Sequence, residues 1–205
     1  RRMFEVNVKG TKKGELITAR RLPDFSTLVM EGKVWKAQDQ TTTAVLVAPP
    51  TTVSGLTVQN PTKDKYYVLF ALTGYVNVVP GTLGMVSLWH CAHKLAVNTL
   101  YTRDISLQAT GAEAIDGLMA GQGAYPGAII MDRGATVVDD GWTPVGEPIE
   151  SNIATTNFVS REIPLRLPVI IPPAMHYSIA GLATVVTFEL GLGIVWAEVD
   201  LNDLV

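Results

Sequence analysis

Hydrophobic and polar residues alternate with a period of two along most of this chain. The clearest stretch is residues 178–197, where large apolar side chains fill the even positions Val186, Phe188, Leu190, Leu192, Ile194 and Trp196. Positions two apart share one face of a strand, whereas a helix would spread these six around its circumference. The stretch has twenty residues and a single charge, as a spanning helix would. Its internal order nevertheless predicts β structure and not a membrane span.

Short β-branched or aromatic runs recur along the rest of the chain, separated by Gly, Pro, Asn, Asp and Thr. About a dozen strands at this spacing predict an all-β fold, a β-sandwich of jelly-roll type, and not βαβ units. The one segment that could be a helix is residues 111–121, although its glycines weaken that interpretation. Residues 139–152 are interpreted as a long surface loop. Prolines are expected at strand ends and on edge strands.

One expected strand, residues 65–76, is apolar on both faces. Tyr66, Val68, Phe70 and Leu72 would share one face, and Tyr67, Leu69 and Ala71 the other. An antiparallel strand with one solvated face would alternate instead. Either a second layer of the same chain or a neighbouring subunit must cover the second face, and the composition favours the subunit.

That composition is poor in charge. Hydrophobic residues make up 47% of the 205 residues and charged residues 17%, against roughly 25% charged in an ordinary globular domain. We therefore expect much of the surface to be covered in an assembly, and obligate self-association. The formal net charge of −3 provides no overall field that would attract nucleic acid or an anionic membrane, and we expect neither as a partner.

Charge is unevenly distributed between two segments. Residues 1–36 carry nine Lys and Arg against four Asp and Glu, a net charge of +5, and residues 37–205 carry seven against fifteen, a net charge of −8. We interpret residues 1–36 as a basic N-terminal arm and residues 37–205 as the β-sandwich domain. The arm either is a solvated terminus or binds an acidic partner surface. In the second case the contacts would come from Arg1, Arg2, Lys12, Lys13, Arg20 and Arg21.

Residues 87–95, SLWHCAHKL, contain the most reactive side chains of the chain: its only cysteine and two of its three histidines. In a regular strand His90 and His93 point to opposite faces and cannot bind one ion. Cys91 and His93 share a face and could act as two metal ligands or as nucleophile and base. His176 is the only other histidine, and none of the usual metal motifs is present. We therefore interpret Cys91 as a core residue and expect no metal and no cofactor.

No other motif predicts an enzyme. The nucleophile elbow, the Walker loop, the dinucleotide-binding glycines and the calcium loop are all missing. Two carboxylates near the expected loop could form a glycosidase pair, but loops carry solvated acids for no catalytic reason. The candidates are Asp132, Asp139, Asp140, Glu147 and Glu150. We expect a protein without catalytic residues.

The C-terminal third resembles small β-sandwich structural proteins of tailed bacteriophages. In those proteins a strand ending in Val-Pro-Pro-Gly leads into a Ser-containing strand, and a closing strand ends in Trp-Glu-Glu-Val. Here the matching residues are Ile170, Ile171, Pro172 and Pro173, then Ser178, then Trp196, Glu198 and Val199. Upstream, VQNPTKDKYYVLFAL is similar to the segment that leads into a long apolar strand. The chain departs from the pattern at Ala174, where Gly is expected, and at Ala197, where Glu is expected.

This resemblance, over about residues 53–205, implies a virion structural protein: a capsid decoration or cement protein, or a head fibre, that forms a homotrimer and binds other virion proteins. It implies no catalytic residue. The alternative is a receptor- or glycan-binding module of a phage tail, which would present aromatic residues on loops, with Trp142 and Tyr125 as candidates. Trp142 is expected either at a partner interface or folded back onto its own domain.

Overall fold

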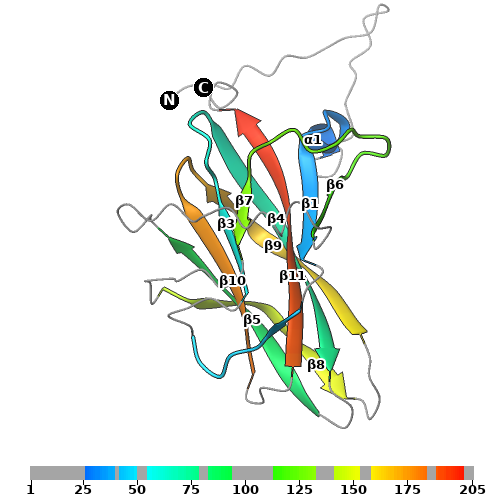
Figure 1. The fold of residues 1–205 in the computed structure, drawn as a ribbon, viewed down its shortest axis with the longest axis vertical. Coiled ribbons are helices and arrows are strands. Elements are labelled where there is room, and N and C mark those ends of the chain that lie inside the picture. The colour runs from blue at the N-terminus through cyan, green and yellow to red at the C-terminus, as the bar shows by residue number, and fades with distance from the viewer. Residues whose placement is uncertain are drawn as a thin grey trace, which may run out of the picture.

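The computed structural model describes residues 26–39, 42–49, 55–78, 83–93, 113–132, 141–152, 158–183 and 188–200. In this part of the chain nearly all regular structure is β-strand, in two antiparallel sheets (Figure 1), so the predicted all-β class is confirmed. The elements are α1 (Ser26–Met30), β1 (Val34–Asp39), β2 (Thr43–Ala44), β3 (Leu56–Gln59), β4 (Lys65–Val78), β5 (Leu83–His93), β6 (Glu113–Gly117), β7 (Ile130–Asp132), β8 (Thr143–Asn152), β9 (Phe158–Ile171), β10 (His176–Leu182) and β11 (Phe188–Asp200).

Strands that follow one another in sequence mostly lie in different sheets. The first sheet has the order β6-β1-β11-β4-β9, with β2 paired to β11, and the second has the order β7-β3-β10-β5-β8. Among the strands that the structure describes, only the successive pairs β1 and β2, and β7 and β8, lie in the same sheet, and at every other step the next strand belongs to the other sheet. Figure 1 shows the long strands β4 and β11 running side by side along most of the sandwich.

Side chains from both sheets meet in one main hydrophobic core. The row predicted on the even positions of β11 supplies a large part of it, since Phe188, Leu190, Leu192, Ile194 and Trp196 are all buried there. Because each fully buried side chain of this size contributes about 1.5–3 kcal/mol, this row is a main stabilising element. The prediction of β structure over residues 178–197 is confirmed for β10 and β11. Among the described residues, no helix is long and apolar enough to cross a membrane.

The second face of β4 is covered by the chain itself near Ala71. A bulge at Phe70 shifts the register against β11, so that Leu69 and Leu72 both reach the main core while Ala71 points outward. There Ala71 is buried in a small cluster on the outer face of the first sheet, against Leu28 and Val29 of α1. The strict alternation predicted for β4 is therefore wrong beyond the bulge, and a second layer, not a subunit, covers this position.

Two local sequence predictions are wrong, and backbone pairing explains both. The helix expected at residues 111–121 is replaced by β6, which pairs with β1, so that tertiary pairing overrides a weak helix pattern rich in glycine. The loop expected at residues 139–152 contains β8, which pairs with β5. Its prolines are tolerated because β8 is an edge strand, like β9 of the other sheet. This confirms the expected edge positions of Pro144, Pro148, Pro164 and Pro168.

The expected N-terminal arm lies mostly outside the described residues, which begin at Ser26. Its six candidate contact residues, between Arg1 and Arg21, are among those outside. The boundary expected at residue 36 falls within β1, where Val34 and Trp35 are already buried and paired with β11. The first sheet therefore begins before that boundary.

Candidate functional site

The segment around Cys91 forms β5, and its histidine and cysteine side chains face different surroundings. Cys91 is 2% exposed and packs in a small cluster with Trp142 and Ala180. On the opposite face His90 Nδ1 lies 2.8 Å from the hydroxyl of Tyr177, and burial lowers the pKa of His90. The side chain of His93 lies outside the described residues. In the part of the chain that the structure describes, no three His, Cys, Asp or Glu side chains are grouped as metal ligands.

The carboxylates considered as a glycosidase pair can be placed only in part. Glu147 lies on β8, is exposed, and forms a 2.7 Å ion pair with Arg161 of β9. The side chains of Asp132 and Glu150, and residues Asp139 and Asp140, lie outside the described residues. Glu147 thus contacts an arginine, and no second carboxylate can be assigned to act with it.

Neither aromatic residue proposed for a receptor-binding loop is presented to solvent. Trp142 is 6% exposed and folds back onto its own chain against Cys91. Tyr125 is half-buried, edge-on to Trp35 and Trp196 with ring centroids 5.0 and 5.6 Å away. Of the two interpretations of Trp142, the structure therefore agrees with packing onto its own domain, and it offers no exposed ring there for a partner.

Tyr125 belongs to a polar cluster that holds the connection between β6 and β7. Its hydroxyl donates a hydrogen bond to Glu198 of β11, and the ammonium of Lys65 lies 3.0 Å from the other carboxylate oxygen. Burial, together with the neighbouring Tyr67 and Glu198, raises the pKa of Tyr125. The hydrogen bond to Glu198 raises the pKa of Lys65. The buried carboxylate of Glu198 thus ties the connection between β6 and β7 to the neighbouring strands β11 and β4, which is a structural role.

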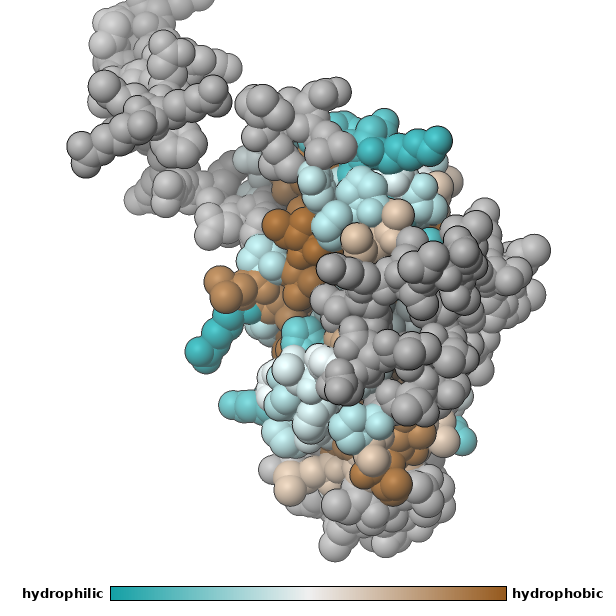
Figure 2. Space-filling model, turned by 90° about the vertical axis from the view of Figure 1, so that its left-hand side faces the viewer, coloured by the Kyte–Doolittle hydropathy of each residue, from teal (hydrophilic) through white to brown (hydrophobic). Residues whose placement is uncertain are grey.

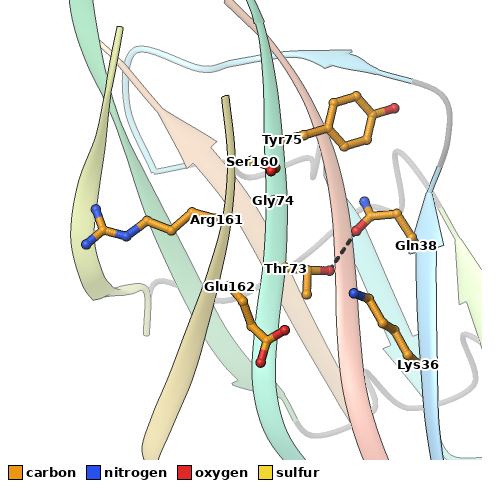
Figure 3. A pocket seen from close by; sticks show the side chains of 8 residues that line it. All are labelled: Lys36, Gln38, Thr73, Gly74, Tyr75, Ser160, Arg161 and Glu162. Atoms are coloured by element: carbon orange, nitrogen blue, oxygen red, sulfur yellow. Dashed lines mark hydrogen bonds between the residues drawn. The ribbon is translucent and has the colours of Figure 1, made fainter. Parts of the chain in front are cut away.

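A groove of about 490 Å³ on the outer face of the first sheet is lined mainly by polar and charged residues. It lies across β1, β4 and β9, beyond the part of that face covered by α1. Strands distant in sequence converge there because β11 pairs with both β1 and β4, and β4 pairs with β9. The lining residues, drawn in Figure 3, are Lys36, Gln38, Thr73, Gly74, Tyr75, Ser160, Arg161 and Glu162.

Two glycines of β11 make room for the side chains in this part of the sheet. Gly191 pairs directly with Tyr75, and a Cβ atom at Gly191 would collide with the tyrosine ring. Gly193 lies between Gln38 and Thr73, and the Thr73 hydroxyl donates a 2.7 Å hydrogen bond to Gln38 Oε1 across it. The glycines therefore let side chains from the flanking strands lie over β11 in fixed positions.

The charges of the groove come from opposite sides. Figure 3 shows Lys36 of β1 and Glu162 of β9 on either side of Thr73, while Arg161 points away from the others. Arg161 donates instead to Glu147 and to the carbonyl oxygen of Pro148 on β8. The side chains facing the groove thus carry one positive and one negative charge. Burial and the nearby Asp39 raise the pKa of Tyr75, so its hydroxyl stays protonated at neutral pH.

Comparisons with models of protein families, with curated proteins and with solved structures find no match to this chain. The groove is therefore interpreted from its own chemistry. The sequence predicted none of its residues as a site, because they belong to three strands and form no motif. One feature of the sequence could have indicated this groove. Two odd positions of β11 are Gly191 and Gly193, which leave the outer face of the strand without side chains there.

Proposed function

We propose that this chain is a virion structural protein of a tailed bacteriophage, a capsid decoration or cement protein with a jelly-roll fold that self-associates and binds the head surface. The observation that carries the proposal is the strand order. Jelly rolls consist of two Greek keys in two packed sheets and recur in viral capsid domains. Fold alone does not determine function. The proposal therefore also rests on the residues that resemble the phage pattern and on the exposed residues of β9.

Eight of the strands pair in the order expected for one long hairpin that is folded over to form two sheets. The first pairs with the last, β1 with β11, and the pairing continues inward as β3 with β10, β4 with β9, and β5 with β8. These pairs form β1-β11-β4-β9 in one sheet and β3-β10-β5-β8 in the other. β6 and β7 extend the edges next to β1 and β3. This arrangement supports a jelly roll with an insertion between β5 and β8 that contains β6 and β7.

The two residues that depart from the phage pattern are Ala174, which has an unusual backbone conformation, and Ala197, which is buried. Ala174, where Gly is expected, has φ of 61° and is the one non-glycine residue with positive φ among the described residues. Glycine is the residue that takes up this conformation without steric cost, so the backbone matches the turn in which that family has Gly. Ala197, where Glu is expected, is fully buried in the cluster with α1, which leaves no space for a carboxylate.

Self-association is supported by the surface of the edge strand β9. Leu167 is 82% exposed and Ile170 is 55% exposed, and a contact with another copy of the chain would remove these aliphatic side chains from water. Figure 2 shows brown hydrophobic residues at the surface, between hydrophilic side chains. The face of β4 at Ala71, where a neighbouring subunit was expected, and the even positions of β11 are covered within the chain. The homotrimeric state follows from the resemblance alone.

We further propose that the basic residues between Arg1 and Arg21 bind an acidic surface of the capsid. Their attachment should weaken as salt rises, because exposed charges are screened over about 10 Å at 0.1 M. Neither nucleic acid nor a membrane is a proposed partner.

Immunogold electron microscopy of purified phage particles, with an antibody raised against this chain, tests the proposal. Label on the outer surface of the heads is the expected result. Unlabelled particles would refute the virion role, and label confined to the tails would favour the receptor-binding alternative.

A further inference from the structure

We propose that the groove across β1, β4 and β9 is a binding site for a neutral oligosaccharide. This site does not depend on a virion role, because it follows from the side chains that line the groove. Its volume of about 490 Å³ lies within the roughly 300–1,000 Å³ of small-ligand sites. Those side chains come from three strands and meet through the register of the sheet, not through a local loop.

Hydrogen-bonding capacity is the first argument for a sugar. Sugar hydroxyl groups both donate and accept, so a site for them needs both kinds of partner close together. Lys36 supplies a donor and Glu162 an acceptor, while the hydroxyls of Ser160 and Thr73 offer lone pairs. Thr73 uses its own proton on Gln38 Oε1, which leaves its oxygen to accept. This mixture would satisfy a polyhydroxylated ligand and would leave an apolar one with unpaired polar groups beneath it.

Charge balance is the second argument, and it favours a neutral ligand. An anion bound near Lys36 would face the carboxylate of Glu162, and a cation bound near Glu162 would face the ammonium of Lys36. Arg161 does not change this balance, because its guanidinium is held by Glu147 and the Pro148 carbonyl on the other side of β9. A phosphate-rich ligand such as nucleic acid is disfavoured for the same reason.

The ring of Tyr75 is the third argument. Sugar rings present flat faces of C–H groups, which pack against aromatic side chains, and a tyrosine adds a polar hydroxyl at its end. Tyr75 is half-buried and lies over Gly191, so the ring is positioned before any ligand arrives. A ring fixed in this way loses little conformational freedom on binding, which makes Tyr75 the central contact of the site.

Binding of the purified full chain to an array of printed oligosaccharides, both neutral and charged, tests this proposal. The oligosaccharide bound most strongly is then titrated by calorimetry. We expect a neutral oligosaccharide to bind, with the dissociation constant about tenfold higher for Tyr75→Ala and for Glu162→Gln. Tyr75→Phe, which keeps the ring, should restore most of the affinity. Arg166→Ala is the matched control for Glu162→Gln. Like Glu162, Arg166 is an exposed charged residue of β9, but it does not line the groove.

Three results would overturn the proposal. They are the absence of any neutral oligosaccharide among those bound, selective binding of sulfated or sialylated ones, and equal affinity of the unmodified chain and Tyr75→Ala. Because Tyr75→Ala could alter the fold, circular dichroism of each variant accompanies the titration. Glu162→Gln changes an exposed side chain and gives an independent result.

Discussion

Tyr75 of β4 lies over Gly191 of β11, its direct partner in the first sheet, where any Cβ atom would collide with the ring. Two residues further along, Gly193 allows Thr73 to reach Gln38 of β1 above β11. On its other face the same strand carries the large side chains of the main core. One face of β11 thus contributes to the hydrophobic core, and its other face leaves room for the side chains that line the groove.

Alanine substitutions at these two glycines should have different effects. A Cβ atom at Gly193 would meet the backbone carbonyl oxygen of Ala37, which cannot move without disturbing β1. A Cβ atom at Gly191 would meet the Tyr75 side chain and no backbone atom among its nearest neighbours, and a side chain is displaced at lower cost than a backbone carbonyl. We expect Gly193→Ala to lower the free energy of unfolding by about 1–3 kcal/mol and Gly191→Ala to lower it less. Urea denaturation of both variants checks the order, and equal losses would contradict it.

Ala174→Gly should stabilise the protein. The left-handed conformation at Ala174, with φ of 61°, costs roughly 1–2 kcal/mol for a residue with a Cβ atom, whereas the greater freedom of glycine in the unfolded chain costs about 0.4–1 kcal/mol. The net gain should be about 0.5–1 kcal/mol. Gly32→Ala, at a glycine with φ of 69°, is the matched control and should have the opposite sign. Thermal denaturation of the two variants measures both shifts, and a destabilised Ala174→Gly would refute the argument.

Ala71→Glu should damage the fold of the single chain. Ala71 is 4% exposed and packs under Leu28 and Val29 of α1, so a carboxylate there would be buried without a partner. The expected loss of unfolding free energy is about 3 kcal/mol or more. Chemical denaturation at low protein concentration measures it. If this variant kept full stability and lost only its self-association, the position of α1 over Ala71 would be wrong.

Stability should fall as the pH rises above 10. Burial raises the pKa of Tyr67, Tyr125 and Tyr177 above the ordinary value of 10.0. Above pH 10 the unfolded chain therefore loses protons that the folded chain keeps, and the free energy of unfolding decreases. Well above pH 10, each such tyrosine contributes about 1.4 kcal/mol per pH unit.

Urea denaturation between pH 9 and pH 11.5 measures this dependence. Tyr177→Phe should make the decrease shallower. It should also lower stability at neutral pH by about 0.5–1.5 kcal/mol, because the hydrogen bond to His90 is lost. A free energy of unfolding that stays constant up to pH 11 would show that these hydroxyls are accessible to solvent in the folded state.

The double variant Leu167→Asp, Ile170→Asp should dissociate the proposed oligomer. The two substitutions place charges on the exposed aliphatic surface of β9, where burial against another copy would leave them unpaired. Light scattering should give about 66 kDa for the unmodified protein, three chains of 22.1 kDa, and a single chain for the variant. Val47→Asp, at a residue 69% exposed outside β9, is the control and should not change the mass. An unmodified protein of 22 kDa would contradict self-association.

The sequence predicted the parts of the fold that depend on local periodicity. The core row from Phe188 to Trp196 and the prolines of the edge strands follow from a period of two and from a missing backbone donor. The bulge at Phe70 could not be predicted, because it appears only in the pairing of β4 with β11. The same limit applies to β6 and β8, which are strands because they pair with the edges of β1 and β5.

The groove shows this limit most clearly. Gln38, Gly193, Thr73 and Glu162 lie side by side because three strand registers align them. A single sequence offers no information on those registers. The sequence led us to interpret Cys91 as a core residue, and it left Trp142 either at a partner interface or folded back onto its own domain. Both side chains are buried in the structure, which agrees with the core interpretation of Cys91 and with the second interpretation of Trp142.

Quantitative mass spectrometry of purified phage heads, separated from tails, tests the central claim that this chain is a structural component of the head. Peptides of this chain are expected in the head fraction, in a constant ratio to the main shell protein from one preparation to the next. Washing the heads with increasing salt should lower that ratio, because salt would screen the proposed contacts of the basic residues between Arg1 and Arg21. Absence of the chain from the heads, or its presence only in the tail fraction, would contradict the account.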